Sequence, residues 1–298
     1  MLAAFLRNDK NPTLATVGVL SGGIFNIFGD YIFVFVFDMG ILGAGLATSI
    51  GSVISCIVML THFVSKRNSL ALVKPTKVFH KLKEISVTGF STFFIDVAMG
   101  ILTILFNRQI MKYLGTNALS VYGIIVNVST FVQCCAYSVG QASQPIISVN
   151  YGAKLGNRIK ETLKYSIYSV IFFSLLWTLL SLLVPNMFVQ IFMTPTKEIL
   201  KIAPAIIRCY GLSFLLLPIN IFSTYYFQAL LKPKASFIIS VSRGLVISSV
   251  LIFILPLTNS NNIWLTMPFT EVIVAIFAVV TMLRYTKKLP VEKEYTHE

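Results

Sequence analysis

The sequence predicts an all-α membrane protein with about eight transmembrane helices. Of its 298 residues, 56% are hydrophobic and only 12% are charged, which is about half of the charged fraction of a soluble domain. Eight apolar stretches lie between charged and turn residues, and each is close to the roughly twenty residues that cross hydrocarbon. They span residues 13–37, 42–63, 85–111, 119–142, 165–184, 203–229, 235–256 and 263–285.

The basic residues predict the orientation of these helices. The net charge is +13, and if segment 64–84 marks one face, eighteen Lys and Arg fall on that face and four on the other. Loops rich in Lys and Arg stay in the cytoplasm. We therefore expect a multi-pass protein of the cell membrane, the plasma membrane, with a cytoplasmic C-terminus. The lipid bilayer is its expected partner, and nucleic acid is not, because the basic charge follows topology.

A weak internal repeat predicts the domain organisation. The segment around Pro12 resembles the segment around Pro233, 221 residues further on, and transporters often contain such repeats. If the repeat is a six-helix bundle, residues 1–65 are the last two helices of an amino-terminal lobe whose first four are absent. Residues 66–84 are then a cytoplasmic linker, or a solvated loop that only connects. Residues 85–288 form a complete carboxy-terminal six-helix lobe, and 289–298 a cytoplasmic tail.

Three carboxylates lie within apolar stretches and are the main candidates for coupling. They are Asp30, Asp96 and Glu271. A charge in hydrocarbon costs at least a few kcal/mol, so each is expected to face a cavity or a partner. Their similar depth predicts a shared or paired wet compartment. A carboxylate there can hold a proton or exchange it for a cation, as an antiporter requires.

Structural roles remain open for these carboxylates. Asp30 has Asn26 nearby as a hydrogen-bond partner or as a second site residue, and Glu271 has Thr266 and Thr270. Basic residues within the stretches are fewer, and Arg243 is expected to extend its side chain towards the membrane surface. The sequence thus predicts an acid-rich, base-poor membrane centre, which favours a small organic cation as cargo.

Polar side chains form a stripe on the fourth apolar stretch. Gln133, Tyr137, Gln141 and Gln144 are spaced by four, four and three residues, so they share one helical face. The stripe is expected either to line a cavity or to form hydrogen bonds between helices. Residues 140–145, from a glycine to a proline, are expected to interrupt the backbone after this helix.

No motif of the common enzyme classes is found. The sequence has no glycine-rich phosphate loop, no zinc-protease motif and no nucleophile elbow. Its four cysteines lie in apolar stretches without metal-ligand spacing. We therefore expect no enzymatic activity, no metal site and no cofactor other than a coupling ion, H⁺ or Na⁺.

Several segments resemble a known family. The run GQASQPIISVNYGA at 140–153 is similar to the loop signature after the eighth helix of the multidrug and toxic compound extrusion (MATE) family. NIFGDYIF at 26–33, with GILGAGLAT at 40–48, resembles its fifth and sixth helices, and Ile263 through Glu271 resembles its twelfth. The resemblance covers nearly the whole chain.

The resemblance implies two six-helix lobes arranged in a V. It also implies drug efflux coupled to Na⁺ or H⁺, carried out by a monomeric transporter that alternates between outward-open and inward-open states. Asp30 matches the fifth-helix acid of the amino-terminal lobe, whose first-helix partner falls in the missing region. Asp96 lies on the seventh helix, where some members have an essential acid. The tenth helix has no acid here, which departs from the family's sodium site.

These observations lead to one main hypothesis and two alternatives. The main one is a secondary active antiporter that exports organic cations or drugs in exchange for H⁺ or Na⁺. A lipid-linked oligosaccharide flippase of the same superfamily would instead have a central cavity richer in Arg and Lys than in acids. An inactive truncated remnant would lack the upstream helices altogether.

Overall fold

The computed structural model describes residues 2–9, 11–65, 68–69 and 78–289. Within them, the side chains of residues 8, 80, 83–85 and 87–96 are not described. The chain divides into two compact units, Met1–Val78 and Phe79–Glu298. All regular structure in the described ranges is helical, so the predicted fold class is confirmed. The finer assignment of lobes, linker and tail stays a prediction.

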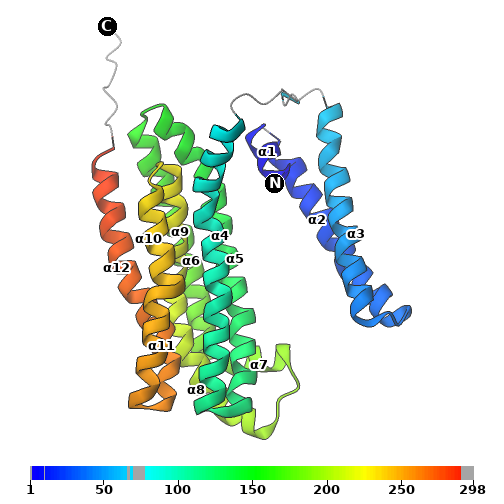
Figure 1. The fold of residues 1–298 in the computed structure, drawn as a ribbon, viewed down its shortest axis with the longest axis vertical. Helices are drawn as coiled ribbons and strands as arrows, with labels where there is room; N and C mark the ends of the chain where they lie inside the picture. The colour runs from blue at the N-terminus through cyan, green and yellow to red at the C-terminus, as the bar shows by residue number, and fades with distance from the viewer. Residues whose placement is uncertain (1, 10, 66–67, 70–77, 290–298) are drawn as a thin grey trace. The chain divides into compact units, whose positions relative to one another are not determined.

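The first unit is built on a pair of long helices (Figure 1). Its elements are α1 (Leu2–Asn8), α2 (Pro12–Asp30) with a π-helical turn (Tyr31–Val36), and α3 (Gly40–Leu60) with a 3-10 turn (Thr61–Val64). Asn11 caps α2, because its side chain accepts a hydrogen bond from the Leu14 amide, and Pro12 suits the first helical position.

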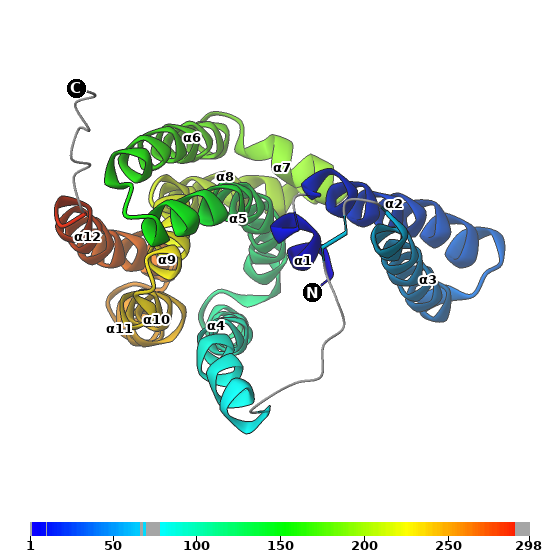
Figure 2. The same cartoon turned by 90° about the horizontal axis from the view of Figure 1, so that it is seen from above.

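The second unit is a bundle of long helices (Figure 1). They are α4 (Val78–Tyr113), α5 (Gly115–Gly152), α6 (Gly156–Leu183), α7 (Pro185–Phe192), α8 (Lys197–Gly211), α9 (Leu217–Ala229), α10 (Pro233–Val241), α11 (Ile247–Thr258) and α12 (Thr266–Lys287). A 3-10 turn, Leu212–Leu215, joins α8 to α9, and a π-helical turn, Ser242–Val246, joins α10 to α11. Seen from above, α5 and α9 pack together at the centre, with α6 on one side and α10 on the other (Figure 2).

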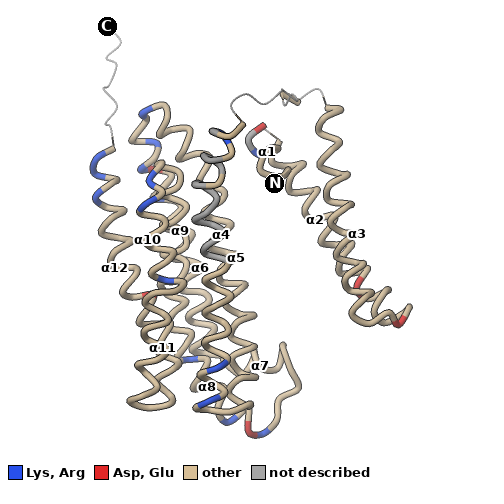
Figure 3. The backbone as a smooth tube through the Cα atoms, in the orientation of Figure 1, with Lys and Arg blue, Asp and Glu red and all other residues tan. Residues whose placement is uncertain are grey.

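Seven of the described helical segments are long and apolar enough to cross a membrane. The predicted stretch that is not among these seven, residues 85–111, lies in α4, which is 36 residues long and whose side chains are only partly described. Most Lys and Arg of the second unit gather at the two ends of its bundle (Figure 3), as expected where the middle lies in hydrocarbon.

One predicted interruption is wrong. Helix α5 continues through Gly140 and Pro145 as far as Gly152, although proline removes a backbone donor and usually ends or kinks a helix. The carbonyl oxygen of Gln141, four residues before Pro145, therefore loses its usual backbone donor. The proline is tolerated here because neighbouring helices support the segment.

Glycines bring α2 and α3 into close contact. A Cβ atom on Gly22 would lie 2.2 Å from Ser55 Oγ and 2.3 Å from the carbonyl oxygen of Gly51. The neighbouring Gly23 has no heavy atom within 4 Å of the same position. Helices in membranes associate largely through such close packing of small residues.

This contrast gives a matched pair of variants. Gly22→Ala is expected to lower the free energy of unfolding by about 1–3 kcal/mol, because the methyl group overpacks the contact between the helices. Gly23→Ala should change it little. Unfolding of both variants in lipid or detergent measures the difference, and equal effects would contradict the packing described.

A buried histidine links the ends of the first unit's helices. His62 is fully buried, and its Nε2 lies 2.6 Å from Asp9 Oδ2 while its Nδ1 lies 3.1 Å from Asn11 Nδ2. The Asn11 amide donates to Nδ1, so Nε2 carries the proton and donates to Asp9. Asp9 also accepts from the backbone N–H and the hydroxyl of Ser69. These donors lower the pKa of Asp9 from 3.8 to about 2, with His62 the main cause.

The first unit should therefore lose stability in acid through Asp9. A depressed carboxyl pKa contributes stability that is present above the ordinary pKa and is lost as the pH falls through the folded value. Asp9→Asn should lower the unfolding temperature at pH 6, and this deficit should shrink between pH 4 and pH 2. Asp38→Asn, at an exposed position, is the control. A deficit that is independent of pH would contradict the role of the charge.

Candidate functional site

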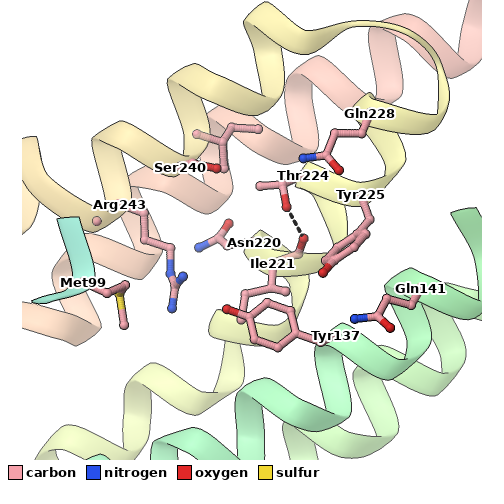
Figure 4. A pocket seen from close by; sticks show the side chains of 12 residues that line it. Met99, Tyr137, Gln141, Asn220, Ile221, Thr224, Tyr225, Gln228, Ser240 and Arg243 are labelled. Carbon is pink, nitrogen blue, oxygen red and sulfur yellow. Dashed lines mark hydrogen bonds between the residues drawn. The ribbon is translucent and has the colours of Figure 1, made fainter. Parts of the chain in front are cut away.

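A cavity of about 460 Å³ lies within the second unit (Figure 4). Its lining comes from α4, α5, α9, α10 and the π-helical turn, and consists of Met99, Tyr137, Gln141, Asn220, Ile221, Thr224, Tyr225, Gln228, Ile239, Ser240, Arg243 and Gly244. The volume falls within the range of roughly 300–1,000 Å³ that is usual for small-molecule sites.

Helix α9 supplies the polar wall of this cavity. Asn220, Thr224 and Gln228 are four residues apart, so they lie on one face of the helix. Ile221 and Tyr225 lie beside them, and the Thr224 hydroxyl donates to the Ile221 carbonyl oxygen at 2.7 Å (Figure 4). The cavity wall is thus a strip of amides and hydroxyls flanked by an aromatic ring.

A buried ion pair links the cavity lining to α12, because Arg243 lines the cavity and its partner Glu271 does not. Glu271 is fully buried and Arg243 is 8% exposed, with 2.7 Å between Arg243 Nε and Glu271 Oε1. Asn220 Nδ2 donates to Glu271 Oε2 at 2.6 Å and to the backbone carbonyl oxygen of Glu271 at 3.0 Å. Three helical elements, α9, α12 and the π-helical turn, are therefore joined through one carboxylate.

Two expectations about these residues are wrong. Arg243 does not extend to the membrane surface, because Glu271 offers it a charge partner within the bundle. The hydrogen-bond partners of the Glu271 carboxylate are Arg243 and Asn220 rather than Thr266 and Thr270. Glu271 is therefore paired with a base, whereas the acid-rich, base-poor membrane centre as a whole stays a prediction.

Arg243 lies in the π-helical turn Ser242–Val246. The turn widens the helix locally between α10 and α11, and such turns often occur at functional sites. The hydroxyl of Ser248 donates to the carbonyl oxygen of Arg243, which supplies a partner to the disturbed backbone. Arg243 Nη2 and Asn220 Oδ1 are buried without a hydrogen-bond partner among the described residues.

The four residues of the predicted polar stripe on α5 have different surroundings. Tyr137 and Gln141 line the 460 Å³ cavity. Gln133 lines a smaller cavity of about 90 Å³, which Arg243 also borders. Gln144 Nε2 lies 3.5 Å from Gln228 Oε1. Both interpretations of the stripe therefore have a structural basis, and its role in binding stays a prediction.

The other candidate residues lie in the first unit or on α4. Asn26 Nδ2 donates to Thr48 Oγ1 at 3.1 Å. Asp30 is half-buried, and its Oδ1 atom is buried without a hydrogen-bond partner among the described residues. The side chain of Asp96 lies outside the described residues. The compartment predicted to be shared by the three carboxylates therefore stays a prediction.

Comparison with known proteins decides the family. The MatE family model matches residues 90–254, more than half of the chain and most of the helices that form the cavity. The chain belongs to the MatE family. This confirms the resemblance drawn from the sequence motifs, and with the seven apolar helices it identifies a multi-pass membrane protein.

Relatives in the MatE family include the multidrug export protein MepA of Staphylococcus saprophyticus, 26% identical over 297 residues. MepA of Staphylococcus haemolyticus is 26% identical over 298 residues. Each alignment covers 98% of this chain and 65% of the relative. The chain thus spans about two thirds of the length of these MatE proteins, which are transporters rather than enzymes.

Solved structures share the fold at low identity. An outward-facing multidrug resistance MATE family transporter has a TM-score of 0.85 at 19% identity, covering 95% of this chain and 64% of that one. A MOP superfamily transporter from Pyrococcus furiosus, described as having a binding pocket of reverse polarity, has a TM-score of 0.85 at 18% identity, covering 95% and 65%. The helical arrangement is therefore that of a MATE transporter.

Proposed function

We propose that the complete protein is a secondary antiporter that exports small organic cations in exchange for H⁺ or Na⁺. The cavity in the second unit, with its neutralised charge pair, is the observation that carries this proposal. Family membership and the relatives named multidrug export proteins support the efflux activity.

The cavity wall suits an amphipathic cation. The rings of Tyr137 and Tyr225 meet edge to face, with centroids 6.1 Å apart and planes at 66°, and aromatic faces attract cations. The side-chain amides of Gln141 and Gln228 also line the cavity, and an amide oxygen can turn towards a cation. Arg243 would repel a cation if it were alone, but Glu271 balances its charge at 2.7 Å.

Coupling is assigned first to Asp96 and then to Asp30. Glu271 accepts hydrogen bonds from a guanidinium and an amide, so both of its carboxylate oxygens are engaged within the bundle. Exchange of a proton at Glu271 would leave the buried Arg243 unpaired, which is costly. We therefore propose that Glu271 supports the cavity wall, while another carboxylate exchanges the ion.

Transport by the complete protein in proteoliposomes tests this function. Movement of a lipophilic cation such as tetraphenylphosphonium should accelerate when H⁺ or Na⁺ is driven in the opposite direction. Collapse of that gradient by the matching ionophore should abolish the acceleration. A transport rate that is independent of both gradients, or an absence of transport under both, would overturn the antiporter assignment.

The oligomeric state and the membrane orientation of the chain are proposed from its sequence. We propose a monomer, as the family resemblance implies, with the C-terminus in the cytoplasm, on the basis of the excess of Lys and Arg on that face. A cysteine placed near Thr196 should then react with an impermeant reagent outside intact cells, whereas one placed near Lys77 should not.

A further inference from the structure

Gly140 on α5 lies directly against the ring of Tyr225 on α9. A Cβ atom built on Gly140 would lie 2.6 Å from Tyr225 Cδ2, 2.7 Å from Cγ and 3.1 Å from Cβ. Real Cβ atoms essentially never approach other heavy atoms closer than 3.0 Å. Tyr225 can therefore occupy its position only because residue 140 has no side chain.

Two of the Tyr225 atoms nearest to Gly140 are Cβ and Cγ, which lie at the backbone end of the side chain. Cβ and Cγ cannot move away by a swing of the ring's far end, so a methyl group at position 140 requires a new χ1 rotamer of Tyr225 or a shift of α9. The α5 backbone blocks one side of the ring. The 460 Å³ cavity, which Tyr225 lines, is the space available on the other side.

Tyr225 is part of the aromatic wall of that cavity. Its ring and that of Tyr137, three residues before Gly140 on the same helix, meet edge to face (Figure 4). A displaced Tyr225 would break this arrangement and narrow the cavity. A narrower cavity would exclude bulky molecules while it still admitted small ones.

We propose that Gly140 is a specificity-determining positioning residue: it holds Tyr225 against α5 and keeps the cavity wide enough for bulky cargo. This inference rests on the function proposed above. It concerns only which cations fit, and makes no claim about the coupling ion.

The test compares two glycines of the same helix. A Cβ atom on Gly123 would have no heavy atom within 4 Å, so Gly123→Ala is the matched control for Gly140→Ala. Transport and equilibrium binding of bulky tetraphenylphosphonium and small tetraethylammonium are measured in the complete protein. Gly140→Ala should raise KM for tetraphenylphosphonium at least about tenfold relative to tetraethylammonium, because the displaced ring takes up room that only the bulky cation needs.

Removal of the ring provides the second variant. In a Tyr225→Ala background, Gly140→Ala should leave the ratio of the two KM values unchanged, because the clash no longer exists. If Gly140→Ala fails to insert but the double variant folds and transports, the clash with Tyr225 is likewise supported.

The outcomes separate this inference from the proposed function. If the wild type transports both cations and Gly140→Ala matches Gly123→Ala, the inference is wrong and the function stands. If Gly140→Ala acts equally in the presence and absence of Tyr225, the inference is also wrong. A wild type that neither binds nor transports either cation overturns the proposed function itself.

Discussion

Replacement of Arg243 by Leu is expected to destabilise the second unit by about 3–5 kcal/mol, because it leaves the Glu271 carboxylate buried without its charge partner. Glu271 is fully buried, so its carboxylate depends on partners within the protein. Of the described residues, Asn220 alone would then donate a hydrogen bond to the carboxylate. Unfolding of purified protein in detergent, followed by temperature or denaturant, measures the loss.

The double variant is the decisive comparison for this pair. Arg243→Leu with Glu271→Leu removes both charges, and replacement of a buried ion pair by apolar residues is often neutral or stabilising. Most of the stability should therefore return. Arg284→Leu, at an exposed position on α12, serves as the control and should have little effect. A double variant as unstable as the single one would show that the pair does not act as a unit.

Replacement of Asp96 by Asn is expected to abolish gradient-driven efflux while folding and membrane insertion remain intact. Asp96 lies within α4, in a stretch whose neighbouring residues are apolar, and an ionisable group there is a functional candidate by default. Asn has nearly the same shape as a protonated Asp and cannot exchange a proton or cation. Cargo binding can survive this change, but coupling cannot.

The assay for Asp96 uses the complete protein in liposomes with a driven ion gradient. Equilibrium binding of tetraphenylphosphonium, which should be retained, controls for damage to the cavity. Asp30→Asn, in the first unit, is measured in parallel. Unchanged efflux by the Asp96 variant would move the coupling role to Asp30.

The helices were predictable from the sequence because the bilayer imposes their length. Each predicted stretch has a helical counterpart, and differences lie mainly at the ends, as where Thr196 caps α8 upstream of the predicted start at residue 203. Pro145 is the main exception. A local rule ends a helix there, whereas packing within the bundle allows α5 to continue.

The site was only partly predictable, because its contacts join residues far apart in the sequence. The stripe on α5 follows from helical periodicity, which is local. The pairing of Arg243 with Glu271 joins residues 28 positions apart, and nothing near either residue specifies the other. An arginine about two turns inside an apolar stretch was the available signal, but its long side chain could equally have reached the membrane surface.

The location of bound cargo tests the central claim most directly. Tetraphenylarsonium has the shape of tetraphenylphosphonium and carries an arsenic atom that scatters anomalously. In crystals of the complete protein soaked with this cation, we expect the arsenic peak within the cavity, beside the rings of Tyr137 and Tyr225 and near Gln141 and Gln228. A peak found only beside Asp30 in the first unit, with this cavity empty, would contradict the account.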